Sequence, residues 1–548
     1  MLVVHRSERA DRLVEALGDL LSAPLPDPVV PEVVAVPTRG VERWLTQRLS
    51  HRLGAPPSAG GVCANLRFPF PGTLVGEATA AACGVDGERD PWRPERAVWP
   101  LVEVIDEGAS DEVLRPLTEH LRAATPPAAG DQGEPVRRFA TARHLADLFD
   151  HYAIHRPQLV LGWAAGTDGG AAGDPSAVWQ AHLWRLLRHR LGVPSPAERF
   201  ASAAELLAAG RAPVDLPGRL SLFGLTRLPA SHLQVLEALG TERDVHLFLL
   251  HPSGRLWAAV AAAYPSVRPA LPRAEDPTAR VAANPLLRSW GRDAREMQLV
   301  LAGAGVTASD HRPVDDGPDP APTLLRRLQD DVRADRSPPG RPAAGQPDER
   351  AVLDPGDRSV QVHACHGRSR QVEVVRDAIL HLLADDPTLE PRDVIVMCPD
   401  IETFAPLVHA AFGADDPDAD GTDGDGLGMP RLRVRLADRS LRQTNPLLGV
   451  AAQLLVLAGS RLTASQVLDL ASRPPVARRF RLDQDDLTTF ERWVEDAGIR
   501  WGLDAEHRRP WHLQRVATNT WSSGLDRLLL GLAMSGEGAP VFGHAVPS

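Results

Sequence analysis

The stretch Arg358–Pro399 reads RSVQVHACHGRSRQVEVVRDAILHLLADDPTLEPRDVIVMCP. Apolar residues alternate with polar ones over Val360–Ala364, which is typical of a strand. A continuous apolar run, Val394–Met397, is typical of a strand buried on both faces. Between the two, apolar residues recur at helical spacing: Val372, Val375, Ile379, Leu382 and Leu383. This order of elements predicts a parallel strand, helix, strand unit and an α/β fold.

The loop after the first of these strands lacks the residues that bind nucleotide phosphates. It runs from Cys365 to Ser369 and contains one glycine and no lysine. All 60 residues counted as Lys+Arg are arginine, so a G-x-x-x-x-G-K-[ST] phosphate loop occurs nowhere in the chain. The sequence therefore has the layout of a nucleotide-driven motor without the lysine that holds the β- and γ-phosphates.

Composition sets the broad class of the protein. A chain of 548 residues with 43% apolar and 24% charged residues is long enough for roughly three or four folded domains. The net charge of −11 argues against general adhesion to nucleic acid, so contacts with DNA are expected only on local basic surfaces. Four dispersed cysteines, and no apolar run of about 18 residues, predict a cytoplasmic protein that does not cross a membrane.

A second α/β pattern opens the chain. Met1–His5 and Glu32–Val36 read as strands, each followed by an amphipathic helix. Arg39 and Arg43 lie one turn apart on the outer side of the second helix. We expect a first parallel-sheet domain from residues 1–90 and 213–336, interrupted by a helical insertion.

The remaining boundaries follow from changes in composition. The helical insertion is expected at 91–212, and a Pro/Gly-rich linker at 337–354. A second parallel-sheet domain is expected at 355–458, followed by a second helical insertion at 459–548. The acidic run Asp415–Gly428 resembles a calcium loop in spacing, but its twelfth position is leucine, and a solvated linker is favoured.

Two kinds of candidate site remain. Asp147, His151 and His155 recur every fourth residue, as three metal ligands on one helix could, although a polar helix face is the simpler interpretation. Arg39, Arg43, Arg48 and Arg52 lie near Trp44, and Arg67 lies beside Phe68 and Phe70. Nucleic-acid channels interleave cations and rings in this way, whereas composition alone favours an ordinary amphipathic helix and a loop that fills the core.

Several longer stretches resemble one family. These are MLVVHRSERADRLVEAL, FPFPGTL, ADLFDHYAIHRP, NPLLRSWGR, VHACHGRSRQVEVVRDAILHLLADDPTLEPRDVIVMCPDIETFAPLVHAAFG, RQTNPLLGVAAQLL, and FERWVEDAGIRWGLD through NTWSSGLDRLLLGLAM. In collinear order they resemble the RecC family, the gamma subunit of the exodeoxyribonuclease V (RecBCD) helicase-nuclease. The resemblance spans essentially the whole chain and covers about the N-terminal half of such a subunit.

The resemblance implies two superfamily 1 helicase-like domains with degenerate phosphate loops. It implies that these domains bind no cofactor of their own and that ATP and Mg²⁺ bind to partner subunits. It implies a non-catalytic DNA-binding scaffold that holds RecB-like and RecD-like motors in double-strand-break repair by homologous recombination. It would help split duplex ends and scan the 3′-ended strand for the hotspot Chi. The family pattern carries DNA-binding roles to Asp147, Leu148, Asp150, His151 and Arg156, and through looser local similarity to Phe70 and Arg199.

The chain departs from the family pattern around Pro37, Arg39 and Arg43, where amide and small polar residues are expected, and at Gly76, which replaces a bulky aromatic. Contact with a DNA strand is therefore expected at Arg39 and Arg43 without assigning the bases. Two alternatives stay open. One is a stand-alone metal-dependent nuclease that uses Asp147 and Asp150, and the other is a helicase-like module that only binds proteins.

Overall fold

The computed structural model describes residues 1–54, 61–87, 89–122, 134–169, 175–265, 276–302, 304, 306–311, 322–413, 432, 434, 436 and 445–533. The chain divides into two compact units. Unit 1 holds Met1–His120 and Phe139–Val394, and unit 2 holds Leu121–Arg138 and Ile395–Ser548. The acidic run at 415–428 lies outside the described residues.

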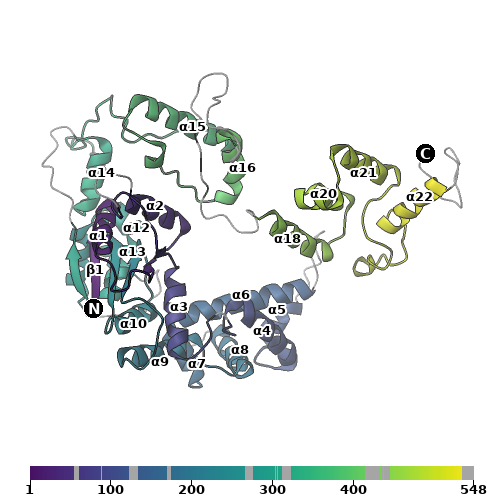
Figure 1. Ribbon diagram of the computed structural model, residues 1–548, viewed down its shortest axis with the longest axis horizontal. Helices are drawn as coiled ribbons and strands as arrows, with labels where there is room; N and C mark the ends of the chain where they lie inside the picture. The colour runs from purple at the N-terminus through teal and green to yellow at the C-terminus, as the bar shows by residue number, and fades with distance from the viewer. Residues whose placement is uncertain are drawn as a thin grey trace. The chain divides into compact units, whose positions relative to one another are not determined.

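Unit 1 is built on a six-stranded sheet in which every pairing is parallel (Figure 1). The strand order is β3-β2-β4-β5-β1-β6. The strands are β1 (Leu2–Ser7), β2 (Glu32–Ala35), β3 (Leu66–Arg67), β4 (Arg219–Phe223), β5 (Asp244–Leu250) and β6 (Thr307–Asp310). The α/β class with a parallel sheet is thus confirmed for the first part of the chain.

Helices cover both faces of this sheet. Alternate residues of β2 show why: Val34 packs with α1 (Ala10–Ser22) and α2 (Arg39–Ser50), whereas Val33 packs with the helices of the opposite face. Those helices are α3 (Pro71–Ala82), α9 (Pro196–Ala208), α10 (Ala230–Leu239) and α13 (Arg292–Leu301). The central strands β2, β4 and β5 are therefore largely buried on both sides, as their apolar sequences require, whereas the edge strands β3 and β6 are more exposed.

The chain between β3 and β4 is helical. Trp92, Phe149, Trp163 and Trp184 are buried there, with the Trp92 and Trp184 ring centroids 5.7 Å apart. The helices are α4 (Pro94–Glu107), α5 (Arg115–Arg122), α6 (Glu134–His155), α7 (Pro157–Ala164) and α8 (Pro175–Leu191), with α9 joining them to the sheet. This segment thus has an aromatic core of its own.

Further helices complete the described chain. In unit 1 they are α11 (Gly254–Ala263), α12 (Pro285–Ser289), α14 (Leu324–Arg333) and α15 (Gly367–Asp385). In unit 2 they are α16 (Ile401–Phe412), α18 (Pro446–Ala458), α19 (Ala464–Ser472), α20 (Pro474–Phe480), α21 (Gln484–Asp496) and α22 (Trp521–Ala533). Short 3-10 turns occur at Gly108–Ser110, Pro277–Arg280, Pro391–Asp393 and Arg509–Trp511.

The strand, helix, strand unit expected at Arg358–Pro399 is only partly present. The helix forms as α15, but neither Val360–Ala364 nor Val394–Met397 is a strand. Met397 is 90% exposed and Ile395 71% exposed, so the burial on both faces expected for Val394–Met397 is wrong, and Val362, 94% exposed, is not covered either. A parallel strand exists only when neighbours complete its hydrogen bonds. The part of the chain that the structure describes places no strand beside either segment, and it contains no second sheet in 355–458.

Candidate nucleic-acid interface

The amino end of α2 positions the arginines expected to contact DNA. Thr38 caps the helix, its hydroxyl oxygen accepting a hydrogen bond from the Val41 backbone nitrogen at 3.2 Å. Arg39 is the first residue of the helix, and Arg43 follows one turn later. Both side chains are exposed, and Arg39 forms an ion pair with Glu42. The cap thus holds two guanidinium groups at the carboxyl edge of β2.

Phe70 lies beside Arg39, as the mixture of cations and rings predicts. The Arg39 guanidinium carbon is 5.2 Å from the centroid of the Phe70 ring. Phe70 is the residue before α3 and is 42% exposed, so one face of its ring remains accessible. The structure therefore brings together a cation and a ring that could neutralise a phosphate and stack on a base.

His232, which was not among the predicted site residues, lies near both α3 and the end of α6. A Cβ built on Gly72 would lie 3.9 Å from Cε1 of His232, which is buried at the start of α10. Burial lowers the pKa of His232 to about 4, with His155 as a second cause. The His151 and His155 rings are 6.2 Å apart. The Ser231 hydroxyl donates to the Ile154 carbonyl at 2.8 Å and fixes α10 against α6.

We name the accessible residues of this region the α2–α3–α6 surface: Arg39, Arg43, Phe70, His151, His155 and Arg156. Arg156 directly precedes α7 and is exposed. His232 lies beneath this surface and links its two ends. Its sequence, Ser-His at the start of a helix, gave no signal, because only the fold brings the start of α10 against both α3 and α6.

The remaining predicted residues of α6 are half-buried. Asp147 forms an ion pair with Arg143 at 3.2 Å, and Leu148 is partly covered. Asp150, to which the family resemblance gives a DNA-binding role, lines a small cavity with Trp92, Phe149 and Trp184. Its carboxyl group therefore lies beside the aromatic core of the helical segment.

Burial raises the pKa of Asp150, with nearby carboxylates as further causes. Asp150→Asn should therefore raise the urea midpoint of unfolding at pH 7, because it removes a poorly hydrated charge. The gain should shrink as the pH falls, since protonation neutralises Asp150 in the parent chain. Asp147→Asn, at an exposed ion pair, is the control and should change the midpoint little. A lower midpoint for Asp150→Asn would contradict the assigned environment.

Arg199 does not reach the α2–α3–α6 surface. It is 5% exposed and donates to Asp90 at 2.6 Å. Asp90 is one of the carboxylates that raise the pKa of Asp150, so Arg199 and Asp150 share one polar region inside the helical segment. This placement favours a structural role for Arg199 over direct contact with a strand.

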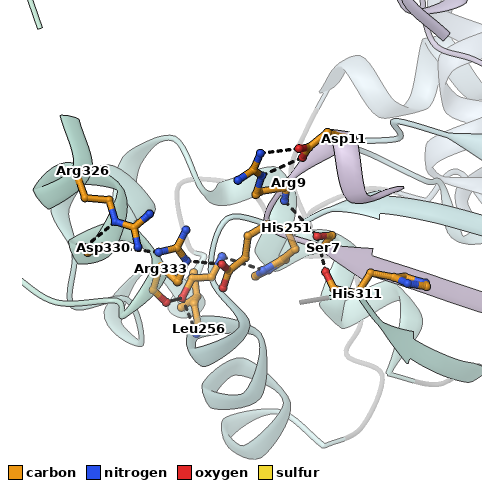
Figure 2. A network of polar contacts seen from close by, with 11 residues as sticks. Ser7, Arg9, Asp11, His251, Leu256, His311, Arg326, Asp330 and Arg333 are labelled. Atoms are coloured by element: carbon orange, nitrogen blue, oxygen red, sulfur yellow. Dashed lines mark hydrogen bonds and ion pairs between the residues drawn. The ribbon is translucent and has the colours of Figure 1, made fainter. Parts of the chain in front are cut away.

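A second polar region lies at the carboxyl edge of the sheet, where α/β proteins bind ligands (Figure 2). The amino end of α1 is the position at which such proteins hold phosphate. Here it carries Glu8, which pairs with Arg333, and Asp11, which accepts from the Arg9 Nε at 2.9 Å. Arg333 is held in turn by Asp330 at 2.7 Å. Carboxylates thus occupy the region that a phosphate would need.

The same edge is closed by hydrogen bonds between strand ends. The Ser7 hydroxyl donates to the His311 carbonyl at 2.6 Å, and the His251 nitrogen donates to the Ser7 carbonyl at 2.9 Å. The Ser253 hydroxyl donates to the Arg333 carbonyl at 2.8 Å, which fixes the end of α14. No acidic pair follows β5, whose chain continues into the buried His251.

The described residues contain no group of three His, Cys, Asp or Glu side chains that could hold a metal ion. The spacing of Asp147, His151 and His155 therefore does not produce a three-ligand cluster, because Asp147 turns to Arg143. No helix in the described ranges is both long and apolar enough to cross a membrane.

Two family models match this chain. The family model described as "RecC, N-terminal domain" matches residues 2–335, and "RecBCD enzyme subunit RecC fourth domain" matches residues 444–548. The chain belongs to the RecC family. It is 46% identical over 547 residues to the RecBCD enzyme subunit RecC of Mycobacterium tuberculosis, covering 100% of this chain and 47% of the relative.

Other RecC proteins match in the same way. RecC of Mycolicibacterium smegmatis is 46% identical over 555 residues, covering 100% of this chain and 47% of the relative. RecC of Escherichia coli is 30% identical over 573 residues, covering 97% of this chain and 48% of the relative. The chain spans about half the length of the curated RecC relatives it matches.

Proposed function

We propose that this chain is a non-catalytic, cytoplasmic, DNA-guiding part of a RecBCD-type exodeoxyribonuclease V complex. In this role it binds DNA beside RecB-like and RecD-like motors and helps split duplex ends during repair by homologous recombination. It scans the 3′-ended strand for a Chi-like sequence. The proposal rests on membership of the RecC family together with the pairing of Arg39 and Phe70 at one edge of the sheet.

The proposal includes a helicase-like α/β domain that binds no nucleotide. The parallel sheet and its carboxyl edge support this part, because the ion pairs of Glu8 with Arg333 and of Asp11 with Arg9 occupy the amino end of α1, where a triphosphate would bind. We propose that the chain needs no cofactor and that ATP and Mg²⁺ act on the partner subunits. The purified chain should hydrolyse no ATP, and hydrolysis at motor-like rates would contradict the proposal.

The α2–α3–α6 surface is proposed as the path of the strand. Arg39 and Arg43 would meet phosphates, Phe70 would stack on a base, and His151, Arg156 and the half-buried Asp147 and Leu148 would line the far end. Asp150 lies beneath this end, and Arg199 supports it through Asp90.

Arg39→Ala/Arg43→Ala should weaken binding of a single strand by the chain and flatten its salt dependence. Removing two phosphate contacts should lower the slope of log K against log salt by roughly 1.4. Fluorescence anisotropy with a labelled oligonucleotide over a salt series measures both quantities. Arg89→Ala/Arg115→Ala removes the same charge from other exposed arginines and is the control.

The same titration separates the alternatives. An unchanged slope would favour a module that binds only proteins. Mg²⁺-dependent cleavage of DNA by the chain, abolished by Asp147→Ala, would favour a stand-alone nuclease, for which the described residues offer no cluster of metal ligands. Co-purification with RecB-like and RecD-like subunits tests the proposed partners.

A further inference from the structure

The end of α20 in unit 2 carries three exposed arginines next to a phenylalanine in the sequence. The residues are Arg478, Arg479, Phe480 and Arg481, and we name them the α20 tip. All four are exposed, and Phe480 is 68% exposed. From Arg473 to Arg481 the sequence contains four arginines and no acidic residue, in a chain whose net charge is −11. The α20 tip is therefore a local basic surface on an acidic protein.

Neighbouring carboxylates do not neutralise the α20 tip. Within the described ranges, the side chains of Arg478, Arg479 and Arg481 form no ion pair or hydrogen bond, whereas Arg473 pairs with Asp469 at 3.3 Å. The acidic residues Asp483 and Asp486, which follow in sequence, cap the amino end of α21. Asp483 accepts from the Asp486 nitrogen at 2.8 Å and Asp486 accepts from the Asp483 nitrogen at 3.1 Å, which forms a capping box.

The backbone at Arg481 has a conformation that suits glycine better than arginine. Arg481 ends α20 in the left-handed conformation with φ +58°, and the Leu482 nitrogen donates to the Ala477 carbonyl at 2.9 Å. Glycine is the usual residue at such a helix end, because an L side chain there is disfavoured by about 1–2 kcal/mol. An arginine at this position adds charge to the surface but leaves the backbone of the turn more strained than glycine would.

We propose that the α20 tip binds a single-stranded nucleic acid, with its guanidinium groups on successive phosphates and Phe480 against a base. Single strands present phosphates and flat bases in alternation, which matches cations that flank a ring. An acidic protein partner fits less well, because burying Phe480 in an interface would desolvate the charges beside it.

This inference goes beyond the proposed function, because the α20 tip belongs to unit 2 and shares no residue with the α2–α3–α6 surface of unit 1. The two surfaces can therefore be tested separately in the same full-length chain.

The first experiment measures binding of a fluorescent oligothymidylate to Arg478→Ala/Arg479→Ala/Arg481→Gly over a salt series. Loss of three phosphate contacts should weaken binding about 10- to 100-fold near 0.1 M salt and lower the salt slope by roughly 2. Arg336→Ala/Arg341→Ala/Arg350→Ala removes the same charge elsewhere and should have a much smaller effect. Equal losses in the two triple variants, or unchanged binding by the first, would overturn the inference.

Two single variants add independent readouts. Phe480→Ala should weaken binding about tenfold without changing the salt slope, since stacking releases no counterions. Arg481→Gly should weaken binding while the urea midpoint stays equal or rises, because glycine relaxes the turn. A lower midpoint for Arg481→Gly would contradict the reading of that position, and unchanged binding by Phe480→Ala would contradict the stacking role.

The outcomes also separate this inference from the proposed function. Normal binding by the α20 tip variants together with weak binding by Arg39→Ala/Arg43→Ala would overturn only the inference about α20. The reverse pattern would overturn only the role of the α2–α3–α6 surface. If the α20 tip variants lose an acidic protein partner while their affinity for the oligothymidylate is unchanged, the nucleic-acid assignment is wrong.

Discussion

Asp90→Ala should destabilise unit 1 by about 3–5 kcal/mol, because the Arg199 guanidinium would remain buried without its carboxylate. The side chains of Arg199 and Asp90 are only 6% and 14% exposed, and their nearest atoms are 2.6 Å apart. Asp90 also accepts from the Trp92 nitrogen at 3.0 Å at the edge of the aromatic core. Urea unfolding followed by tryptophan fluorescence measures the loss.

A double variant identifies the origin of this effect. Asp90→Leu/Arg199→Met removes both charges and should be far less destabilised than Asp90→Ala alone. Asp86→Ala is the matched control, because its partner Arg89 is 82% exposed and such pairs contribute roughly 0–1 kcal/mol. Equal midpoints for Asp90→Ala and Asp86→Ala would show that Arg199 reaches solvent, and would reopen its direct contact with a strand.

Acidification from pH 7 to pH 5 should lower the stability of unit 1 by about 2 kcal/mol for each of His232 and His251. Burial lowers the pKa of both from 6.5 to about 4, and Arg6 contributes to the shift at His251. Because the unfolded chain takes up protons near pH 6.5 and the folded chain only near pH 4, stability is lost as the pH falls between these values. Both histidines are under 10% exposed, so solvent screens them little.

Urea midpoints measured at several pH values test this expectation. His232→Gln should flatten the curve between pH 7 and pH 5, because the titrating group is gone. His144→Gln, at an exposed position on α6, should leave the curve unchanged. A parent curve that is level down to pH 5 would show that these rings are protonated in the folded chain.

The sequence predicted structure best for segments whose secondary structure follows from their own residues. The amphipathic helices α1, α2 and α15 form where their apolar spacing predicts them. The strand pattern at Val360–Ala364 was misleading, because alternation describes a segment that fits a sheet and does not supply the neighbouring strands. The polar strand β6 gave no signal, since its pairing with β1 arises only in the folded sheet.

The candidate site shows the same difference between features that local sequence predicts and features that depend on the folded neighbours. Arg39 and Phe70 could be proposed from sequence because charge and aromaticity are properties of the residues themselves. The contact of Arg39 with Phe70, and the position of His232 near α3 and α6, depend on segments that are up to 160 residues apart in the chain. Whether an arginine is exposed, as Arg39 is, or buried against a carboxylate, as Arg199 is, depends on partners that local pattern cannot reveal.

The pairing of Glu8 with Arg333 bears on any attempt to engineer an ATPase from this chain. A lysine and glycines grafted after β1 would meet two negative side chains, Glu8 and Asp11, at the helix end that must receive the γ-phosphate. The last residue of α14 would also have to withdraw, breaking its link to Ser253. Gaining ATPase activity would thus require coordinated changes in three segments. A single reverting substitution should therefore leave the chain inert toward nucleotides.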